Sequence, residues 1–85
     1  MKRENEPMRQ ACDVMFNASA LAAEVGLSRA TISEWCTGGR PVPPARALQI
    51  ETMTAERKCK IDAELLSPAN ADLIAFMRRR ARQKN

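Results

Sequence analysis

Apolar residues along this chain recur every three or four positions in several separate stretches, which is the spacing of one face of a helix. The first stretch follows Pro7, and proline suits the first turn of a helix. Residues 1–6 are polar, and we expect them to be frayed. The pattern therefore predicts a first helix that begins near Pro7 and places four residues on one face, Met8, Ala11, Cys12 and Met15.

A second, short helix is predicted directly afterwards. Asn17 and Ser19 are both suitable caps for its start. Gly26 marks its end, because glycine readily takes the left-handed conformation that closes a helix. The apolar residues at helical spacing between these signals are Leu21, Ala22 and Val25.

A third and a fourth helix follow. Ser28 is a natural N-cap for a helix over residues 29–36, which the pair Gly38-Gly39 closes. The proline-rich segment 41–44 is held extended, and its last proline can open a helix over residues 44–53. The residues of that fourth helix available to the core are Ala47, Leu48 and Ile50.

The C-terminal part of the chain has weaker signals. Residues 54–61 are polar and basic and receive no assignment, whereas residues 62–66 suggest a brief helix that Ser67-Pro68 stops. Asn70 is a suitable cap for a final helix. That helix carries an apolar stripe made of Leu73, Ile74, Phe76 and Met77.

The composition agrees with a helical protein. Aromatic residues make up 4% of the chain and tyrosine is absent, whereas alanine, leucine, isoleucine and methionine are plentiful. A chain of 85 residues buries only a modest core, so a deep catalytic cleft is not expected. We expect an all-α fold with residues 1–66 as the main domain and residues 67–85 as a C-terminal helix and basic tail.

The positive charge is concentrated at the C-terminus. The formal net charge is +4, but residues 77–85 alone carry +5 and the preceding 76 residues carry nine basic and ten acidic side chains. The expected globular part is therefore almost neutral. Bulk charge alone gives no argument for nucleic-acid binding, which would need a local basic rim instead.

Three cysteines, Cys12, Cys36 and Cys59, are widely spaced and no histidine accompanies them. This spacing resembles neither a zinc site nor a disulfide framework, so we expect small core-filling thiols in a reducing cytoplasm. The chain has no apolar run of membrane-spanning length and no export signal after its charged start. A cytoplasmic protein without a metal or cofactor is expected.

The most specific pattern is the order of small, glycine and apolar residues through the second and third helices. In a helix-turn-helix, two short helices meet at a steep angle, so a small residue is needed at their closest approach and a positive φ at the exit of the first helix. Ala22 and Gly26 meet these two demands. An ordinary pair of amphipathic helices remains the simpler alternative. The seven residues in register are Leu21, Ala22, Val25, Gly26, Leu27, Ile32 and Trp35.

This order is also that of a known group of proteins. Residues 18–35 resemble the helix-turn-helix of Cro-type phage and bacterial repressors, and the segment CTGGRPVPPARALQIE at residues 36–51 is similar to the YdaS-like antitoxin branch of that group. The resemblance covers residues 16–52 and implies a compact, lambda-repressor-like domain of four to five helices. The group often has a glutamine near the start of the second helix for a phosphate contact. This chain has Ala18 and Ser19 there, and the Ser19 hydroxyl can still serve.

If Ile32 and Trp35 face inward, the helical period turns a polar surface of the third helix outward, toward a DNA major groove. Arg29 is the best candidate for a base contact, since a guanidinium can bond both guanine O6 and N7. Glu34 has three open interpretations, which are a cytosine contact, a pairing with a nearby arginine and plain surface. The expected reading surface comprises Ser28, Arg29, Ala30, Thr31, Ser33, Glu34 and Thr37.

Arg40 and Arg46 lie just after the third helix and in the first turn of the fourth. The resemblance implies that residues at these places touch the sugar-phosphate backbone. Free backbone N–H groups at the start of the fourth helix would help to bind phosphate.

A repressor of this type usually binds a palindromic site as a two-fold dimer. The stripe Leu73, Ile74, Phe76 and Met77 is the candidate dimer surface, and the alternative is that this helix folds back on its own core. The arginine run that follows can contact phosphate, complement the helix dipole or form a solvated tail, and the last two are favoured.

The sequence therefore predicts a sequence-specific repressor of double-stranded DNA, of phage or prophage type. The alternatives are an antitoxin or adaptor that mainly binds a partner protein, for which a toxin is a candidate, and a phage transcriptional activator. Enzyme activity is not expected, because no nucleophile and base are brought together and no glycine-rich phosphate cradle is present. The carboxylates Glu24, Glu34, Glu51 and Glu56 are interpreted as charges on helix surfaces.

Overall fold

Helices account for all of the regular structure in residues 4–82, the part of the chain that this computed structural model describes, and that part contains no strand. The expectation of an all-α fold is therefore confirmed. The elements are α1 (Glu6–Val14), α2 (Ala18–Val25), α3 (Arg29–Thr37), α4 (Pro44–Glu56), α5 (Ala63–Leu66), the 3-10 turn η1 (Pro68–Asn70) and α6 (Ala71–Arg82).

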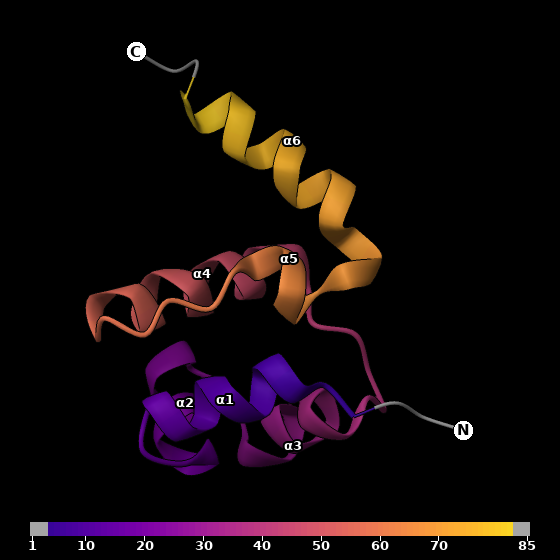
Figure 1. The fold of residues 1–85 in the computed structure, drawn as a ribbon. Helices are drawn as coiled ribbons and strands as arrows, with labels where there is room; N and C mark the ends of the chain where they lie inside the picture. Colours follow the sequence, from indigo (N-terminus) through magenta and orange to yellow (C-terminus); the bar gives the residue numbers. More distant parts are fainter. Residues whose placement is uncertain (1–3, 83–85) are drawn as a thin grey trace.

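The helices form a layered body from which α6 projects (Figure 1). Helices α1, α2 and α3 gather at one end, and α4 lies beside α5 above them. Helix α6 packs against α5 and α4, and its C-terminal end points away from the body. The whole measures 37 × 30 × 20 Å along its principal axes.

Side-chain caps set the starts of the first three helices. Asn17 caps α2, because its Oδ1 accepts from the amide of Ala20 at 2.8 Å, and Ser28 caps α3 in the same way. Of the two candidate caps for α2, Asn17 is thus the one used. Asn5 caps α1, and Glu6 is its first helical residue, so the expectation of a frayed segment up to residue 6 is wrong at these two positions. Residues 1–3 lie outside the described part.

Asn5 ties three helices together. Its backbone N–H donates to the carbonyl of Cys36 at 2.8 Å, and its side-chain amide donates to the carbonyl of Leu66 at 2.8 Å. The start of α1 is thereby held against the ends of α3 and α5. A single asparagine satisfies orphan backbone groups at three helix ends, which would otherwise be costly to leave unpaired.

A single hydrophobic core runs from α1 to α6. Trp35 is its largest member, at 2% exposed, and Ile74 of α6 is fully buried in it. The sequence pattern predicts a domain boundary after residue 66, and in the structure residues on both sides of that position pack in the same core. The core residues are Met8, Ala11, Cys12, Met15, Leu21, Ala22, Val25, Ile32, Trp35, Cys36, Val42, Ala47, Ile50, Ile61, Ala63, Leu66 and Ile74.

Two buried polar residues of α4, Glu51 and Thr54, hold the segment around residues 54–61, for which the sequence predicts no structure. This helix continues to Glu56, three residues beyond the predicted end, and Lys58 then adopts a left-handed φ of 62° that turns the chain back. The buried Thr54 hydroxyl accepts from the amide of Ile61 at 3.0 Å. Glu51 accepts from the amide of Ala63 at 2.8 Å and so holds the first turn of α5.

Arg78 fastens α6 to the body through two carboxylates. Its Nη1 donates to Glu51 Oε2 at 2.8 Å and its Nε donates to Glu64 Oε2 at 2.9 Å, while its Nη2 bonds both carboxylates. The structure thus corrects two expectations. Arg78 forms ion pairs, so it neither belongs to a solvated tail nor acts only on the helix dipole. Glu51 is buried and is therefore not a charge on the helix surface.

These ion pairs shift the acidity of both carboxyls. Hydrogen bonds from Arg78 lower the pKa of Glu64 to about 2, and they also lower the pKa of Glu51 against the opposing effect of burial. The same contacts raise the pKa of Arg78. All three groups are therefore charged near neutral pH, and the cluster carries a net charge of −1.

Replacing Gly26 with alanine should destabilise the protein by about 1–2 kcal/mol, since Gly26 has φ +74° and an L residue is strained there. No atom lies within 4 Å of the added Cβ, so backbone strain is the expected cause. Urea unfolding measures the loss. Gly26→Asn is the matched control, because asparagine tolerates this conformation and should lose less. Equal stability of Gly26→Ala and the wild type would contradict this account.

Arg78→Met should lower the free energy of unfolding by about 2 kcal/mol, between the ~1 kcal/mol of an exposed pair and the ~3–5 kcal/mol of a buried one. The reason is that Glu51 is buried, whereas the side chains of Arg78 and Glu64 are each about one third exposed. Arg79→Met is the control, since Arg79 is exposed on the same helix. It should change stability by less than about 0.5 kcal/mol. Equal effects of the two variants in urea unfolding would rule out the clamp.

The cluster also predicts acid sensitivity. Glu64 titrates near 4.5 in an unfolded chain and at about 2 in the folded one, so the unfolded state binds more protons between these values. Stability should therefore fall as pH drops from about 4.5 toward 2. Thermal unfolding across this range should show a shallower decline for Arg78→Met than for the wild type. Parallel declines would show that other groups cause the acid response.

Candidate nucleic-acid interface

Helices α2 and α3 are joined by a turn of three residues, 26–28. Gly26 takes the left-handed conformation that the sequence predicts for it, and the amide of Leu27 donates to the carbonyl of Ala22 at 2.9 Å. Leu21, Ala22 and Val25 are buried, as expected. The register of small, glycine and apolar residues thus holds α3 against α2 in close contact.

The apolar side of α3 faces the core and its polar side faces solvent. Ile32 and Trp35 are buried, as expected, and Cys36 joins them. Thr31 lies on the flank and is partly buried. The exposed residues of α3 are Arg29, Ala30, Ser33, Glu34 and Thr37, all of which belong to the predicted reading surface.

Two hydroxyls of this surface also serve the helix itself. Ser28 Oγ accepts from the amide of Thr31 at 3.2 Å and lies 3.0 Å from the Thr31 hydroxyl. Thr37 Oγ1 donates to the carbonyl of Glu34 at 3.3 Å. Ser33 forms no such bond within the described part of the chain and is exposed. On this helix, Arg29 and Ser33 thus have the polar side chains least engaged by the fold.

Glu34 pairs with Arg40 across the end of α3, at 3.5 Å between Oε1 and Nη2. Both side chains remain about half exposed. Of the three interpretations of Glu34, pairing with an arginine is the one that this geometry matches. The pair places a cation beside the acid, which reduces the repulsion that a carboxylate would otherwise exert on a phosphate.

Arg46 has a structural contact that the sequence did not indicate. Its Nη1 donates to the carbonyl of Val25 at 3.1 Å and to Gln49 Oε1 at 3.0 Å. The guanidinium thereby satisfies an orphan carbonyl at the C-terminus of α2 and ties α4 to the α2–α3 turn. Ser19, the other residue expected near phosphate, is exposed in the first turn of α2.

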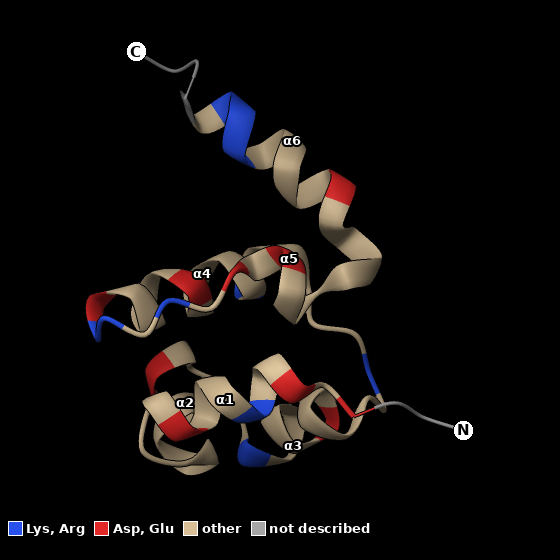
Figure 2. Ribbon diagram, viewed as in Figure 1, with Lys and Arg blue, Asp and Glu red and all other residues tan. Residues whose placement is uncertain are grey.

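Charge is distributed unevenly over the molecule (Figure 2). Basic residues are sparse around α2 and α3, where Arg29 and Arg40 lie, and they are concentrated in the distal turns of α6. This agrees with the near-neutral body inferred from the sequence. Any anion-binding rim near α3 therefore depends on a few individual arginines.

A polar cleft of about 350 Å³ separates part of α1 from α3. It is lined by Arg29, Ser33 and Thr37 of α3 and by polar residues of α1, and two cysteines lie in its wall. Cys12 and Cys36 are buried, as expected of core-filling thiols, whereas Cys59 is exposed, which that expectation did not include.

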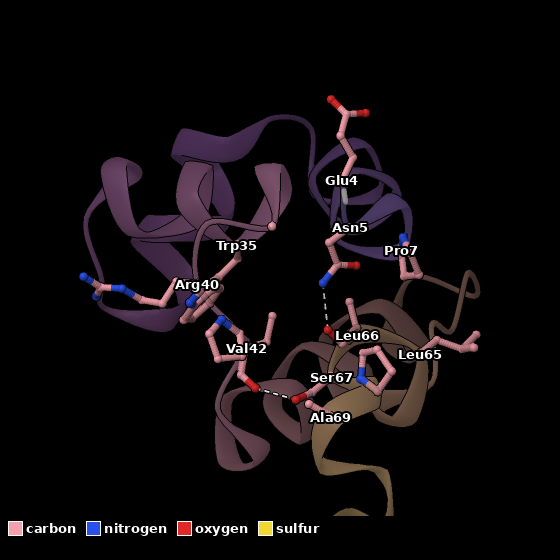
Figure 3. A pocket seen from close by; sticks show the side chains of 13 residues that line it. Glu4, Asn5, Pro7, Trp35, Arg40, Val42, Leu65, Leu66, Ser67 and Ala69 are labelled. Atoms are coloured by element: carbon pink, nitrogen blue, oxygen red, sulfur yellow. Dashed lines mark hydrogen bonds between the residues drawn. The ribbon is translucent and has the colours of Figure 1, made fainter. Parts of the chain in front are cut away.

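A more apolar groove of about 410 Å³ lies where the segment after α3 passes α5 and η1 (Figure 3). Trp35, Arg40 and Leu65 are among its lining residues. The Ser67 hydroxyl donates to the carbonyl of Val42 at 2.5 Å and closes one side of it. The sequence pattern does not indicate this groove, because its walls come from three separate segments, within residues 4–7, 35–42 and 65–69.

The apolar stripe of α6 is divided between core and solvent. Ile74 is fully buried in the chain's own core, so it does not belong to an exposed dimer surface. Leu73 and Phe76 are each 48% exposed, and Met77 is partly buried. The Arg80 guanidinium lies 5.9 Å from the centre of the Phe76 ring. Lys84 of the basic tail lies outside the described residues.

No helix in residues 4–82 is long and apolar enough to cross a membrane. No three histidine, cysteine or acidic side chains in that range come together as a metal site would require.

Comparison with known proteins places the chain in a family. The model of the family described as "Bacterial toxin YdaS" matches residues 8–65, well over half of the chain. The chain belongs to the YdaS family. The matched residues run from α1 through α5, so they include the α2–α3 pair, and the family predicted from residues 16–52 is confirmed.

A curated relative agrees with this assignment. The YdaS protein of Escherichia coli strain K12, named "Putative transcriptional regulator YdaS", is 39% identical over 54 residues, which are 64% of this chain. The chain spans only 55% of that relative's length. No solved structure matches the chain significantly.

Proposed function

We propose that this YdaS-family protein is a sequence-specific repressor that binds double-stranded DNA, with α2 and α3 acting as a helix-turn-helix. The observation that carries the proposal is the rotation of α3. Burial of Ile32 and Trp35 turns Arg29, Ser33 and Glu34 toward solvent on one face of a short helix. A major groove about 12 Å wide accepts such a helix. The name of the Escherichia coli relative agrees with a role in transcription.

Base recognition would centre on the N-terminal half of α3, since recognition helices lead with their first residues. Arg29 is the first residue of α3 and is exposed, so its guanidinium can reach guanine O6 and N7. Ala30 beside it leaves room for a close approach. Ser33 lies one turn further along the same face and can donate to a base or a phosphate.

Phosphate contacts would frame this helix. Arg40 remains 60% exposed even while it pairs with Glu34, so it can reach a phosphate on one side. Ser19 offers a hydroxyl in the first turn of α2. Arg46 uses one nitrogen for the fold, and its remaining N–H groups can still donate to a phosphate.

A homodimer would supply a second α3 about 34 Å away, which matches a palindromic operator. Leu73 and Phe76 are the exposed apolar residues of α6 and are the proposed contacts. The same exposed residues favour a second candidate function, in which the chain is an adaptor or antitoxin whose partner is another protein. The toxin description of the family is compatible with that candidate.

A mobility-shift assay with the DNA upstream of the chain's own gene separates the two candidates. The first predicts salt-sensitive retardation of this DNA at nanomolar protein and much weaker retardation of a scrambled duplex. Absence of any retardation at low salt would reject the proposal and leave the partner-protein function.

Arg29→Ala and Arg40→Ala should weaken binding in different ways. Loss of Arg29 should relax the preference for one base by about 1–3 kcal/mol, whereas loss of Arg40 should weaken all sequences alike and reduce the salt slope by about 1. Arg57→Ala is the matched control, since Arg57 is an exposed arginine at the end of α4 that pairs with Glu24. Binding titrations at several salt concentrations, with cognate and base-substituted duplexes, measure both effects. Identical behaviour of the three variants would contradict the assignment of α3 as the reading helix.

A further inference from the structure

The two buried cysteines form a pair that the proposed DNA contacts do not use. Cys12 comes from α1 and Cys36 from the last turn of α3, and their sulfur atoms are 3.7 Å apart. Each residue is 8% exposed. They lie 24 positions apart in the sequence, so the fold alone brings these thiols into contact.

The surrounding structure favours closure of this pair. A disulfide has its sulfurs about 2.05 Å apart, so the bond requires an approach of about 1.7 Å from the observed distance. The amide of Asn5, just before α1, donates to the carbonyl of Cys36 itself, which holds the two helices in register at this level. Helix α1 also packs directly against α3.

Both thiols are reachable from solvent through the polar cleft between α1 and α3. Cys12 and Cys36 line this cleft, together with Arg9, Asp13 and Arg29. Its volume of about 350 Å³ is more than ten times the roughly 30 Å³ that one water molecule occupies in the liquid. A reactant as small and polar as hydrogen peroxide therefore fits. The mainly polar lining of the cleft does not favour larger, apolar oxidants.

We propose that Cys12 and Cys36 are a hydroperoxide-reactive thiol pair that closes to a reversible disulfide and thereby changes the position of α3. Burial, with contributions from Cys36, raises the pKa of Cys12 to about 12. The two sulfurs are in contact at 3.7 Å and either thiol can donate to the other. The disulfide is the same whichever sulfur attacks the peroxide first.

Disulfide formation takes two steps, written here with Cys36 as the first thiol to react. The Cys36 sulfur attacks one peroxide oxygen, the O–O bond breaks, and the departing hydroxide takes up the thiol proton as water. The Cys12 sulfur then attacks the sulfur of the Cys36 sulfenic acid and expels hydroxide, which takes the Cys12 proton to form a second water. Two thiols are oxidised by two electrons, and one peroxide is reduced to two waters.

The consequence for DNA binding rests on the proposed function of α3. Cys36 is flanked in space by Ser33 and Thr37, which line the same cleft and face outward. Since protein interiors are close-packed, drawing Cys36 toward α1 shifts the last turn of α3 with it. Recognition needs contacts held to within about 0.5 Å, so oxidation should weaken specific DNA binding roughly tenfold or more.

The test uses the full chain carrying Cys59→Ser, because the exposed Cys59 would otherwise link chains to one another. After treatment with hydrogen peroxide, the expected result is the loss of two hydrogen atoms by intact mass and of both titratable thiols, with Cys12 and Cys36 joined in one peptide pair. Dithiothreitol should restore both thiols. Two free thiols after peroxide, or disulfides only between chains, would overturn the proposal.

Single variants in the same background test the sulfenic acid step. Cys12→Ser and Cys36→Ser should each stop at a sulfenic acid on the remaining cysteine, which dimedone traps, and neither should form a disulfide within the chain. Cys12→Ala and Cys36→Ala repeat the comparison if either serine variant fails to fold. Absence of a dimedone adduct in both variants would contradict the two-step route.

DNA retardation by the reduced and oxidised forms tests the coupling to α3 separately. A disulfide with unchanged affinity overturns the coupling and leaves the thiol pair established. If the reduced protein binds no DNA, the proposed function fails, and the mass and thiol readouts still decide the proposal about the cysteines.

Discussion

The burial of Trp35 and Ile32 is the constraint on which the proposed DNA-binding surface depends. A helix of nine residues has one rotational setting once two large side chains enter a core, and here both are 2% exposed or less. Every polar residue of α3 is thereby assigned to the outer face or its flanks. The free energy of burying these side chains, about 1.5–3 kcal/mol each, is far larger than the energy of any single exposed contact on that face.

Other parts of the molecule secure this setting from several sides. Gly26 and the Arg46 bond to Val25 hold the turn that leads into α3, and Asn5 holds its last turn against α1. The Arg78 cluster joins the opposite end of the body to α6. Desolvation makes such a cluster a costly way to gain stability, but its fork geometry fixes where α6 leaves the body.

Hydrophobic period and capping residues were sufficient to predict the first three helices, the start of α4 and the inward face of α3. These signals are local, because each one depends on residues within a turn or two. The end of α4 was missed because Lys58, and not a glycine, takes the left-handed conformation there. The turn after α1 likewise has a non-glycine residue with a positive φ, since Phe16 has a φ of 91° while its side chain is 83% exposed.

Contacts between distant segments lay beyond the sequence pattern. The charge pattern alone could not show that Arg78 would pair with Glu51, which is 27 residues away and whose burial depends on α5 and α6 lying over α4. The same limit applies to the stripe on α6. Its spacing identifies an apolar face, but only the packed structure separates the buried Ile74 from the exposed Leu73 and Phe76.

Contact between DNA and the outer face of α3 can be observed residue by residue in an NMR titration of the ¹⁵N-labelled full chain with a duplex that the chain itself selects from a random pool. The largest amide shifts should fall on residues 28–37 and on Arg40, with α5 and η1 nearly unchanged. Largest shifts on α6 or along the groove beside Leu65, with α3 unperturbed, would contradict this contact.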